Sequence, residues 1–176
     1  YGDMLCVFHQ IVKDRLVAQG RDPAEIFVTG NPAFDFLVDI GSRRRLKFVK
    51  PHILYLAQSE LTTSSRDPSS SNTANVIYET LDALSQLVGL GLCSATVRWH
   101  PNMQELEIDI SKETLISVSI SPFEKDLLSA DFVMTASSTG GFQAQAIGIP
   151  VVQIGWSNRS ALFHFSDFGP AVFVKS

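Results

Sequence analysis

The sequence predicts an α/β fold in which helices cover a parallel sheet on both faces, the doubly wound arrangement. Short apolar runs alternate along the chain with segments whose apolar residues recur at the spacing of an α-helix. The runs are continuously apolar, as strands buried on both faces of a parallel sheet are. With 45% hydrophobic and 18% charged residues, the 176-residue chain can also bury the core that one domain needs.

The first part of the chain is predicted to hold two short strands and two helices. Apolar runs predict the strands, and Gly20 closes the first helix as a C-cap glycine would. In chain order the expected elements are the strand Met4–Phe8, the helix His9–Gln19, the strand Ile26–Thr29 and a weak helix at Phe34–Val38. Residues 39–51 are mixed and basic, and this composition favours a linker.

From residue 52 onward, strands and helices alternate regularly. The expected strands are His52–Ala57, Ala95–Trp99, Thr114–Ile120, Phe132–Thr135 and Val151–Ile154. The expected helices are Ala74–Val88, Phe123–Ser129 and Gly140–Ile147. The composition of a long polar tract, Leu61–Ala74, predicts a loop. In a doubly wound sheet, ligands bind beyond the carboxyl ends of the strands, so a site is expected there.

Charge and composition exclude several classes of function. The net charge of −4 and the pI near 5.5 argue against a nucleic-acid partner. No apolar stretch approaches the roughly 20 residues that span a bilayer, so any membrane association is expected to be peripheral. Cys6 and Cys93 match no metal-ligand spacing, and no metal site is predicted. Both cysteines are expected to be reduced and buried, which favours a cytoplasmic protein.

Five small residues, Ser137 to Gly141, stand where a predicted strand becomes a predicted helix. A helix start offers free N–H groups and the positive end of the helix dipole, and hydroxyls add further donors for a phosphate. Glycines would let the backbone approach a ligand closely. The alternative interpretation is a helix N-cap followed by a tight turn, which accounts for one serine and one glycine. The residues alone leave both interpretations open.

A second candidate is His100, at the end of the strand Ala95–Trp99 and just before Pro101. A histidine at a strand end often caps a turn, and that alternative also stays open. If the sheet is parallel, however, His100 lies at the same edge as Ser137 and Ser138. A third segment, Val28–Asp35, contains a sharp Gly-Asn-Pro turn.

These three segments resemble the GT-B superfamily, which includes sugar-nucleotide glycosyltransferases and UDP-N-acetylglucosamine 2-epimerases. "VTGNPAFDFL" is similar to the segment that closes their first domain, and "RWHPN" to the His-Pro motif of bacterial capsule, sialic-acid, Kdo and glycerophosphate transferases. "TASSTGGFQAQAIGIPVV" is similar to their Ser-Ser motif. The resemblance implies a Rossmann-like carboxyl-terminal domain at residues 52–176, a linker at 39–51 and a remnant of the first domain at 1–38. A missing amino-terminal domain would precede residue 1.

The resemblance also implies roles for individual residues. His100 would contact the donor phosphate, and Ser137, Ser138 and Thr139 would hold the phosphates at the helix start, where Gly140 gives access. Gln143 stands where the family commonly has a glutamate that accepts hydrogen bonds from the donor ribose. An amide oxygen can accept too, but without the charge. The catalytic base would belong to the missing domain, so no catalytic residue is assigned.

The function implied is that of the donor-binding half of a transferase. Such an enzyme would move a sugar or polyol phosphate from a nucleotide-activated donor to a glycan or lipid-linked acceptor in surface-polysaccharide assembly. It needs no cofactor, because the nucleotide sugar or CDP/CMP-type donor is its substrate. One alternative, a UDP-N-acetylglucosamine 2-epimerase, predicts an acidic pair where this chain has Phe142-Gln143. The other alternative is a nucleotide-sugar-binding module without catalysis.

Overall fold

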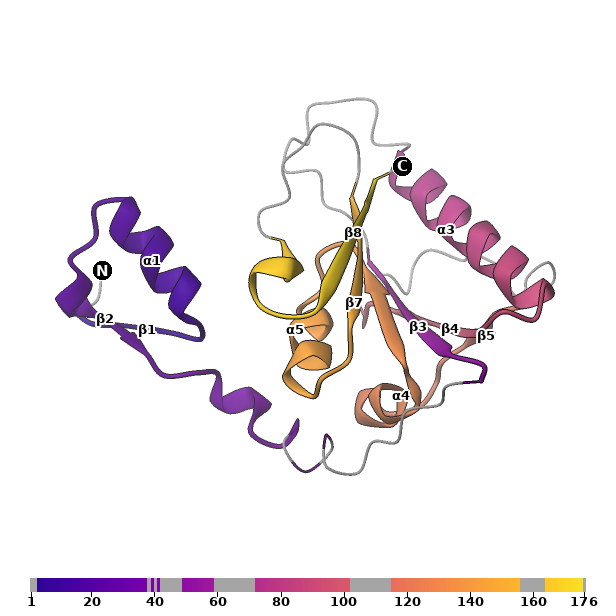
Figure 1. The fold of residues 1–176 in the computed structure, drawn as a ribbon, viewed down its shortest axis with the longest axis horizontal. Helices are drawn as coiled ribbons and strands as arrows, with labels where there is room; N and C mark the ends of the chain where they lie inside the picture. The colour runs from indigo at the N-terminus through magenta and orange to yellow at the C-terminus, as the bar shows by residue number, and fades with distance from the viewer. Residues whose placement is uncertain are drawn as a thin grey trace.

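The main sheet has six strands, all parallel, in the order β5-β4-β3-β6-β7-β8 (Figure 1). The computed structural model describes residues 3–37, 39, 41, 49–58, 72–101, 115–155 and 164–175. The strands are β3 His52–Ala57, β4 Ser94–Trp99, β5 Ser117–Val118, β6 Phe132–Thr135, β7 Val151–Gly155 and β8 Ala171–Lys175. The helices around them are α3 Asn72–Gly89, α4 Phe123–Ser129, α5 Thr139–Ala146 and the 3₁₀ turn η6 Phe165–Asp167. The predicted doubly wound parallel sheet is confirmed.

The sequence-based boundaries agree with this structure to within a few residues, with one omission. Strand β8 was not among the predicted elements, although it pairs with β7 over its whole length. Its sequence, Ala-Val-Phe-Val-Lys, is a short apolar run like the others, but half of it stays exposed at the sheet edge. The predicted loop Leu61–Ala74 lies mostly outside the described residues, as does most of the predicted linker.

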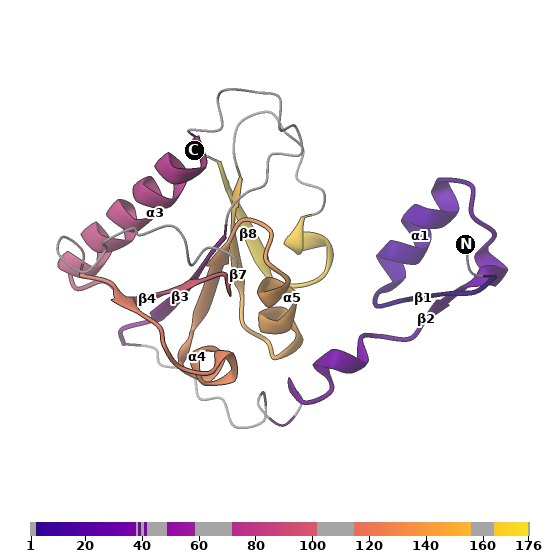
Figure 2. The same ribbon diagram turned by 180° about the vertical axis from the view of Figure 1, so that it is seen from behind.

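The helices divide the sheet into two faces, because alternate strand residues point to opposite sides. Figures 1 and 2 show α3 on one face and α4 and α5 on the other. In β3, Tyr55 and Ala57 join the core beneath α3, whereas Leu54 and Leu56 join the core beneath α4 and α5. Both cores exclude water from apolar side chains, which is the main stabilising term of the fold.

A smaller unit at the amino terminus stands apart from the sheet in Figures 1 and 2. Its elements are β1 Leu5–Val7, α1 Gln10–Ala18, the turn η1 Pro23–Glu25, β2 Ile26–Val28 and the turn η2 Pro32–Phe34. The strands β1 and β2 pair in parallel, and α1 connects them. Gly20 has a positive φ of 95° and closes α1, with its N–H donating to the Val17 carbonyl at 2.9 Å, as the sequence predicts.

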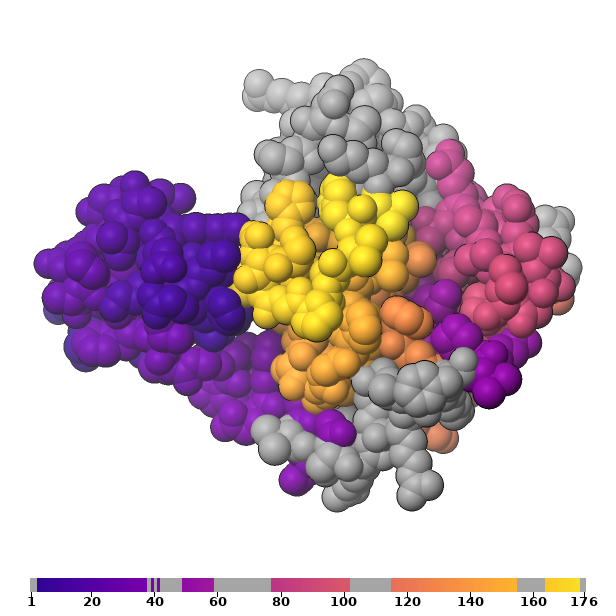
Figure 3. Space-filling view, in the orientation of Figure 1, coloured from indigo at the N-terminus to yellow at the C-terminus, as the bar shows by residue number. Residues whose placement is uncertain are grey.

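This unit contacts the larger domain through aromatic rings. Phe8 lies 5.3 Å from Phe142 of α5 and 5.5 Å from Phe168, measured between ring centroids. The ring of His9 lies 5.2 Å from that of Phe168, and Arg15 forms an ion pair with Asp167. Figure 3 shows the indigo amino-terminal residues in contact with the yellow carboxyl-terminal ones. We call Phe8, His9, Phe142 and Phe168 the aromatic bridge.

The two cysteines differ in exposure. Cys93 is buried, as expected, and this burial raises the pKa of its thiol, which the positive charge of Lys50 partly opposes. Cys6 is exposed, so the prediction that it is buried is wrong. The neighbouring Val7 takes the buried side of β1, and Cys6 must therefore point to the opposite side. In the described parts of the chain, no helix has the length and apolar character needed to cross a bilayer.

The loop between β5 and α4 is fixed by one buried carboxylate. Asp126 accepts hydrogen bonds from Ser119 at 2.8 and 2.7 Å and from the Arg98 guanidinium at 2.8 Å. The same guanidinium group donates to the Ser121 carbonyl at 2.6 Å and lies 5.5 Å from the centroid of the Phe123 ring. Arg98 thereby connects β4 to the start of α4, whose first turn borders α5.

Replacing Asp126 with asparagine is expected to lower the free energy of unfolding by about 2 kcal/mol, because Arg98 loses its charged partner in a half-buried position. Urea denaturation followed by circular dichroism measures the change. The matched control is Asp82→Asn on the exposed side of α3, where we expect a change below about 0.5 kcal/mol. Equal effects of the two substitutions would show that the Arg98–Asp126 contact contributes nothing specific.

Candidate functional site

The strand order creates a switch point between β3 and β6. The chain runs from β3 through β4 to β5, then returns by way of α4 to β6 on the other side of β3. At such a point the loops after two adjacent parallel strands diverge, which opens a crevice beyond their carboxyl ends. Here the loops begin with Gln58, after β3, and with Ala136, after β6. The motif Ser137 to Gly141 therefore lies where a doubly wound sheet binds its ligands.

The loop that leads into α5 is held from both neighbouring strands. Thr135, fully buried at the end of β6, donates its hydroxyl to the Leu56 carbonyl of β3 at 3.2 Å and accepts the Ser138 N–H at 3.3 Å. Gln153 of β7, also buried, donates to the Ala136 carbonyl at 3.1 Å and accepts the Phe165 N–H at 3.0 Å. These bonds fix the backbone on both sides of Ser137.

Ser138 is the N-cap of α5. Its Oγ accepts the Gly140 N–H at 3.3 Å, so the capping interpretation holds for this serine. Accepting this bond leaves the hydroxyl proton for a second partner. Thr139, the first residue of the helix, is exposed, and the first N–H groups of a helix have no partner within it. The helix start therefore keeps donors and positive dipole for an anion while its own cap is made.

Ser137 is exposed and accepts a hydrogen bond from the side-chain amide of Gln58. This bond spans the switch point from the end of β3 to the start of the β6–α5 loop. Sequence reasoning missed Gln58, because a single glutamine after a strand carries no pattern. Gln153 was missed for the same reason. Only the pairing of β3 with β6 and of β6 with β7 brings these amides to the motif.

The two glycines of the motif serve the core. A Cβ on Gly140 would lie 2.6 Å from Leu56 Cδ1 and 3.0 Å from Phe123 Cζ. A Cβ on Gly141 would lie 2.4 Å from Cζ of Phe165. Both glycines are buried, and their bare Cα atoms let the first turn of α5 pack against the sheet and against Phe165. The structure gives the glycines this packing role, and the expectation that they also let a ligand approach the backbone stays a prediction.

His100 lies at the same edge of the sheet. It is exposed, directly follows β4, and donates its N–H to the Ala57 carbonyl at 2.9 Å, one residue beyond the β3–β4 pairing. Across the edge the order is His100, Gln58 and Ser137, at the ends of β4, β3 and β6. Since neighbouring strands are about 4.8 Å apart, about 10 Å of sheet separates β4 from β6. That His100 and Ser137 contact one ligand stays a prediction.

Gln143 lies in the second turn of α5 and is half-buried. Its amide makes no hydrogen bond to the described residues, so both its oxygen and its nitrogen remain for a ligand. It lies one turn from the helix start and directly follows Phe142 of the aromatic bridge in the sequence. In the described parts of the chain, no group of three His, Cys, Asp or Glu residues is arranged to hold a metal ion.

The chain is similar in structure to two larger proteins. With the wall teichoic acid polymerase TagF it shares 14% identity and a TM-score of 0.54, over 97% of this chain and 46% of that one. With a putative UDP-N-acetylglucosamine 2-epimerase from Listeria monocytogenes it shares 22% identity and a TM-score of 0.55, over 86% of this chain and 42% of that one. At these identities the likeness concerns the fold, and the Rossmann-like prediction is confirmed.

The chain spans less than half the length of either of these structures. No protein-family model matches its sequence, and no curated protein matches it either. The epimerase bears the same enzyme name as one of the two classes that the sequence motifs resemble.

Replacing Gly141 with alanine is expected to lower the free energy of unfolding by about 2 kcal/mol, because the new methyl group overlaps the Phe165 ring. Urea denaturation measures it. Gly89→Ala is the matched control: its Cβ would lie 3.4 Å from Leu115 Cδ1, an ordinary contact at the end of α3, and we expect a change below about 1 kcal/mol.

A double-mutant cycle with Phe165→Leu identifies the cause. Removing the distal ring atoms should relieve the overlap, so the two substitutions together should cost at least about 1 kcal/mol less than the sum of their separate costs. Simple additivity would contradict the packing role assigned to Gly141.

Proposed function

We propose that this chain is the donor-binding part of an enzyme that transfers a sugar or a polyol phosphate from a nucleotide-activated donor. One observation carries the proposal. Helix α5 starts at the switch point of the described sheet, and the loop before it is fixed by Thr135, Gln153 and Gln58. A fixed array of donors at the positive end of a helix is the arrangement that stabilises negative charge on phosphate.

In this proposal each residue at the edge has a distinct role. Thr139 donates its backbone N–H to the donor phosphates, and the Ser138 hydroxyl adds its proton while its oxygen caps the helix by accepting the Gly140 N–H. His100 approaches the phosphate from the end of β4. Gln143 accepts from the ribose through its amide oxygen, with a weaker bond than a carboxylate would make.

Gln58 holds the Ser137 hydroxyl before a ligand arrives. The Gln58 amide carries two N–H donors, and one of them is bound to the Ser137 oxygen. A phosphate oxygen can replace the Ser137 oxygen as the acceptor of this N–H. The edge then presents donors from three neighbouring strands. Charge that develops on the leaving nucleotide is neutralised by these dipoles and hydrogen bonds. We also propose a glycan or lipid-linked acceptor and a role in a surface-polysaccharide pathway, and for these two points the support is the sequence motifs alone.

One alternative is a UDP-N-acetylglucosamine 2-epimerase, which the second structural likeness favours. An epimerase is expected to have an acidic pair at the positions of Phe142 and Gln143. In this structure Phe142 belongs to the aromatic bridge. A ring in that place contributes packing and no proton transfer. The transferase proposal needs no acid at position 142, and we therefore prefer it. A binding module without catalysis is the other alternative, and the uncharged Gln143 favours it.

Nucleotide titration tests the proposed site. CMP, CDP, UMP and UDP are titrated into the ¹⁵N-labelled chain, and at least one of them should shift the amide signals of residues 137–141. Cytidine and uridine should not, because they lack the phosphate. Ser138→Ala should weaken binding by about 0.5–1.5 kcal/mol, the contribution of one hydrogen bond.

The matched control is Ser85→Ala on α3, which should leave nucleotide affinity unchanged while removing a hydroxyl of the same kind. Thermal unfolding of both variants separates the loss of the cap from the loss of binding. If none of the four nucleotides shifts the amides of residues 137–141 at millimolar concentration, the turn is a helix cap and the proposal fails.

The chain alone is expected to have no turnover, because catalysis between two domains needs groups from both walls of the cleft. The structural likeness covers less than half of either larger protein, in agreement with this expectation. Release of nucleotide from a panel of UDP- and CMP-activated sugars and CDP-activated polyols is the measurement. Turnover above the rate without protein would show that this chain contains the catalytic base.

A further inference from the structure

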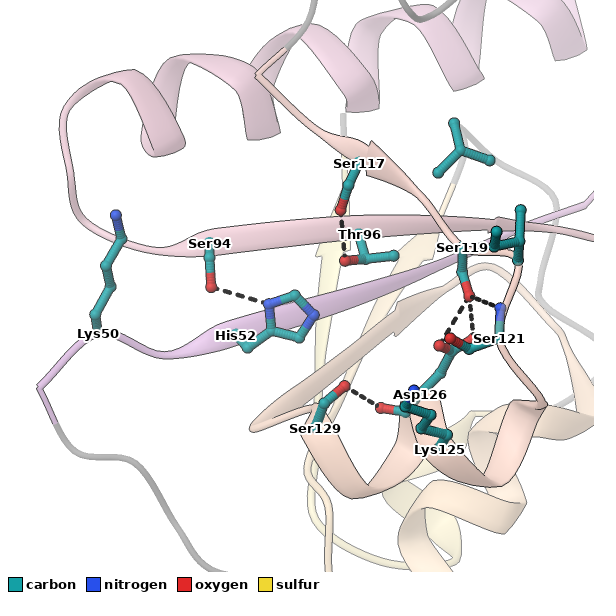
Figure 4. A pocket seen from close by; sticks show the side chains of 12 residues that line it. Lys50, His52, Ser94, Thr96, Ser117, Ser119, Ser121, Lys125, Asp126 and Ser129 are labelled. Atoms are coloured by element: carbon teal, nitrogen blue, oxygen red, sulfur yellow. Dashed lines mark hydrogen bonds between the residues drawn. The ribbon is translucent and has the colours of Figure 1, made fainter.

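A polar groove of about 380 Å³ lies on the α4 face of the sheet, away from the switch point. Strands β3, β4 and β5 form its floor and α4 forms one wall (Figure 4). Along β3, the groove lies at His52, the first residue of the strand. Gln58 of the proposed phosphate site follows the last residue of the same strand. The two sites therefore lie at opposite ends of the same strand.

The alternation of residues in β4 explains why the floor of the groove is polar. In the strand Ser94–Trp99, Ala95 and Val97 point to the core beneath α3, and the alternate residues Ser94 and Thr96 point to the groove. A parallel sheet is normally apolar on both faces because helices cover both. Here the part of the face beyond α4 is polar, so it is built to meet water or a polar ligand and not another apolar surface.

Hydroxyl groups on the floor are held in fixed positions. Ser94 Oγ lies 2.9 Å from His52 Nδ1, and Thr96 Oγ1 lies 2.9 Å from Ser117 Oγ (Figure 4). A serine or threonine hydroxyl has one donor and two acceptor positions, so each keeps hydrogen-bonding capacity beyond these contacts. Such an array matches a ligand that itself carries several hydroxyl groups.

The charge of the groove is positive. Its one carboxylate, Asp126, is already engaged by Arg98 and Ser119. Lys50 and Lys125 also line the groove, and neither forms an ion pair with the residues that the structure describes. Figure 4 shows Lys50 at the end near Ser94 and Lys125 on α4. Two ammonium groups that form no ion pair with the described residues favour an anion, and the occupied Asp126 leaves no carboxylate for a cation.

We propose that this groove binds a phosphorylated polyol or sugar phosphate, an anion that also carries hydroxyl groups. The lysines attract the phosphate as point charges, and Ser94, Thr96 and Ser117 exchange hydrogen bonds with the hydroxyls. An apolar ligand would find only Val118 and Ile120 on the lining. The site is separate from the nucleotide site and does not depend on the proposed function.

The test is a titration of the ¹⁵N-labelled chain with glycerol 3-phosphate, followed through the amide signals of Ser94, Thr96 and Ser117. These signals should shift, whereas glycerol, which lacks the charge, should shift none of them. Lys125→Gln should weaken binding about tenfold, the effect of losing one charge-assisted hydrogen bond. Lys13→Gln, on α1 of the amino-terminal unit, is the charge-matched control and should leave the affinity unchanged.

Inorganic phosphate and the variant Thr96→Val separate hydroxyl recognition from charge alone. Thr96→Val should weaken the binding of glycerol 3-phosphate severalfold and that of inorganic phosphate not at all. If both ligands bind equally and Thr96→Val changes neither, the groove is a site for any anion and the proposal is overturned. It is also overturned if no ligand shifts the three amides at millimolar concentration.

A short glycerol phosphate oligomer distinguishes a free metabolite from a segment of a polymer. Tighter binding of the oligomer than of the monomer, with both in the groove, supports a polymer as the source, and equal binding supports the monomer. Nucleotides report on residues 137–141 and these anions on the floor of the groove. Failure of this proposal is therefore distinguishable from failure of the proposed function.

Discussion

The close approach of helix α5 to the sheet is the constraint on which the candidate site depends. Leu56, Phe123 and Phe165 occupy the space that side chains at positions 140 and 141 would need. The helix start can reach the carboxyl edge of β6 only because those positions are bare. A larger residue there would push the first turn outward and move its N–H groups away from Ser137 and Gln58. The geometry of the proposed anion site therefore follows from the packing of the core.

One face of the sheet is divided between two kinds of chemistry. Beneath α4 and α5 it is apolar, and Leu54, Leu56 and Val133 are fully or nearly fully buried there. Toward β5 the same face is polar and open. The Arg98–Asp126 pair lies at the boundary, where it joins the strand to α4 and neutralises a carboxylate that would otherwise repel anions. A single ion pair thus contributes to the fold on one side and to the electrostatics of the groove on the other.

The sequence predicted the fold class and almost all strands, since buried parallel strands are continuous apolar runs and their helices have a clear period. Strand β8 was not predicted, because a half-exposed edge strand lacks the signal of a strand buried on both faces. The site motif was predicted as a helix start, and Ser138 is indeed its cap. The partners Gln58 and Gln153 could not be predicted, because they are distant in sequence and reach the motif only through strand pairing. The packing role of the glycines likewise depends on Phe165, which follows them by more than twenty positions in the sequence.

The aromatic bridge couples the amino-terminal unit to the first turn of α5. Phe142 contacts Phe8 on one side and follows directly on Gly140 and Gly141 on the other. Any ligand that tightens or tilts this turn changes the free energy of the contact with Phe8. By thermodynamic reciprocity, the orientation of the amino-terminal unit then changes the affinity of the turn for its ligand by the same factor. Phe142 shares the contact between the two parts of the chain with Phe168 and with the Arg15–Asp167 ion pair, and among these residues it is the one that belongs to α5.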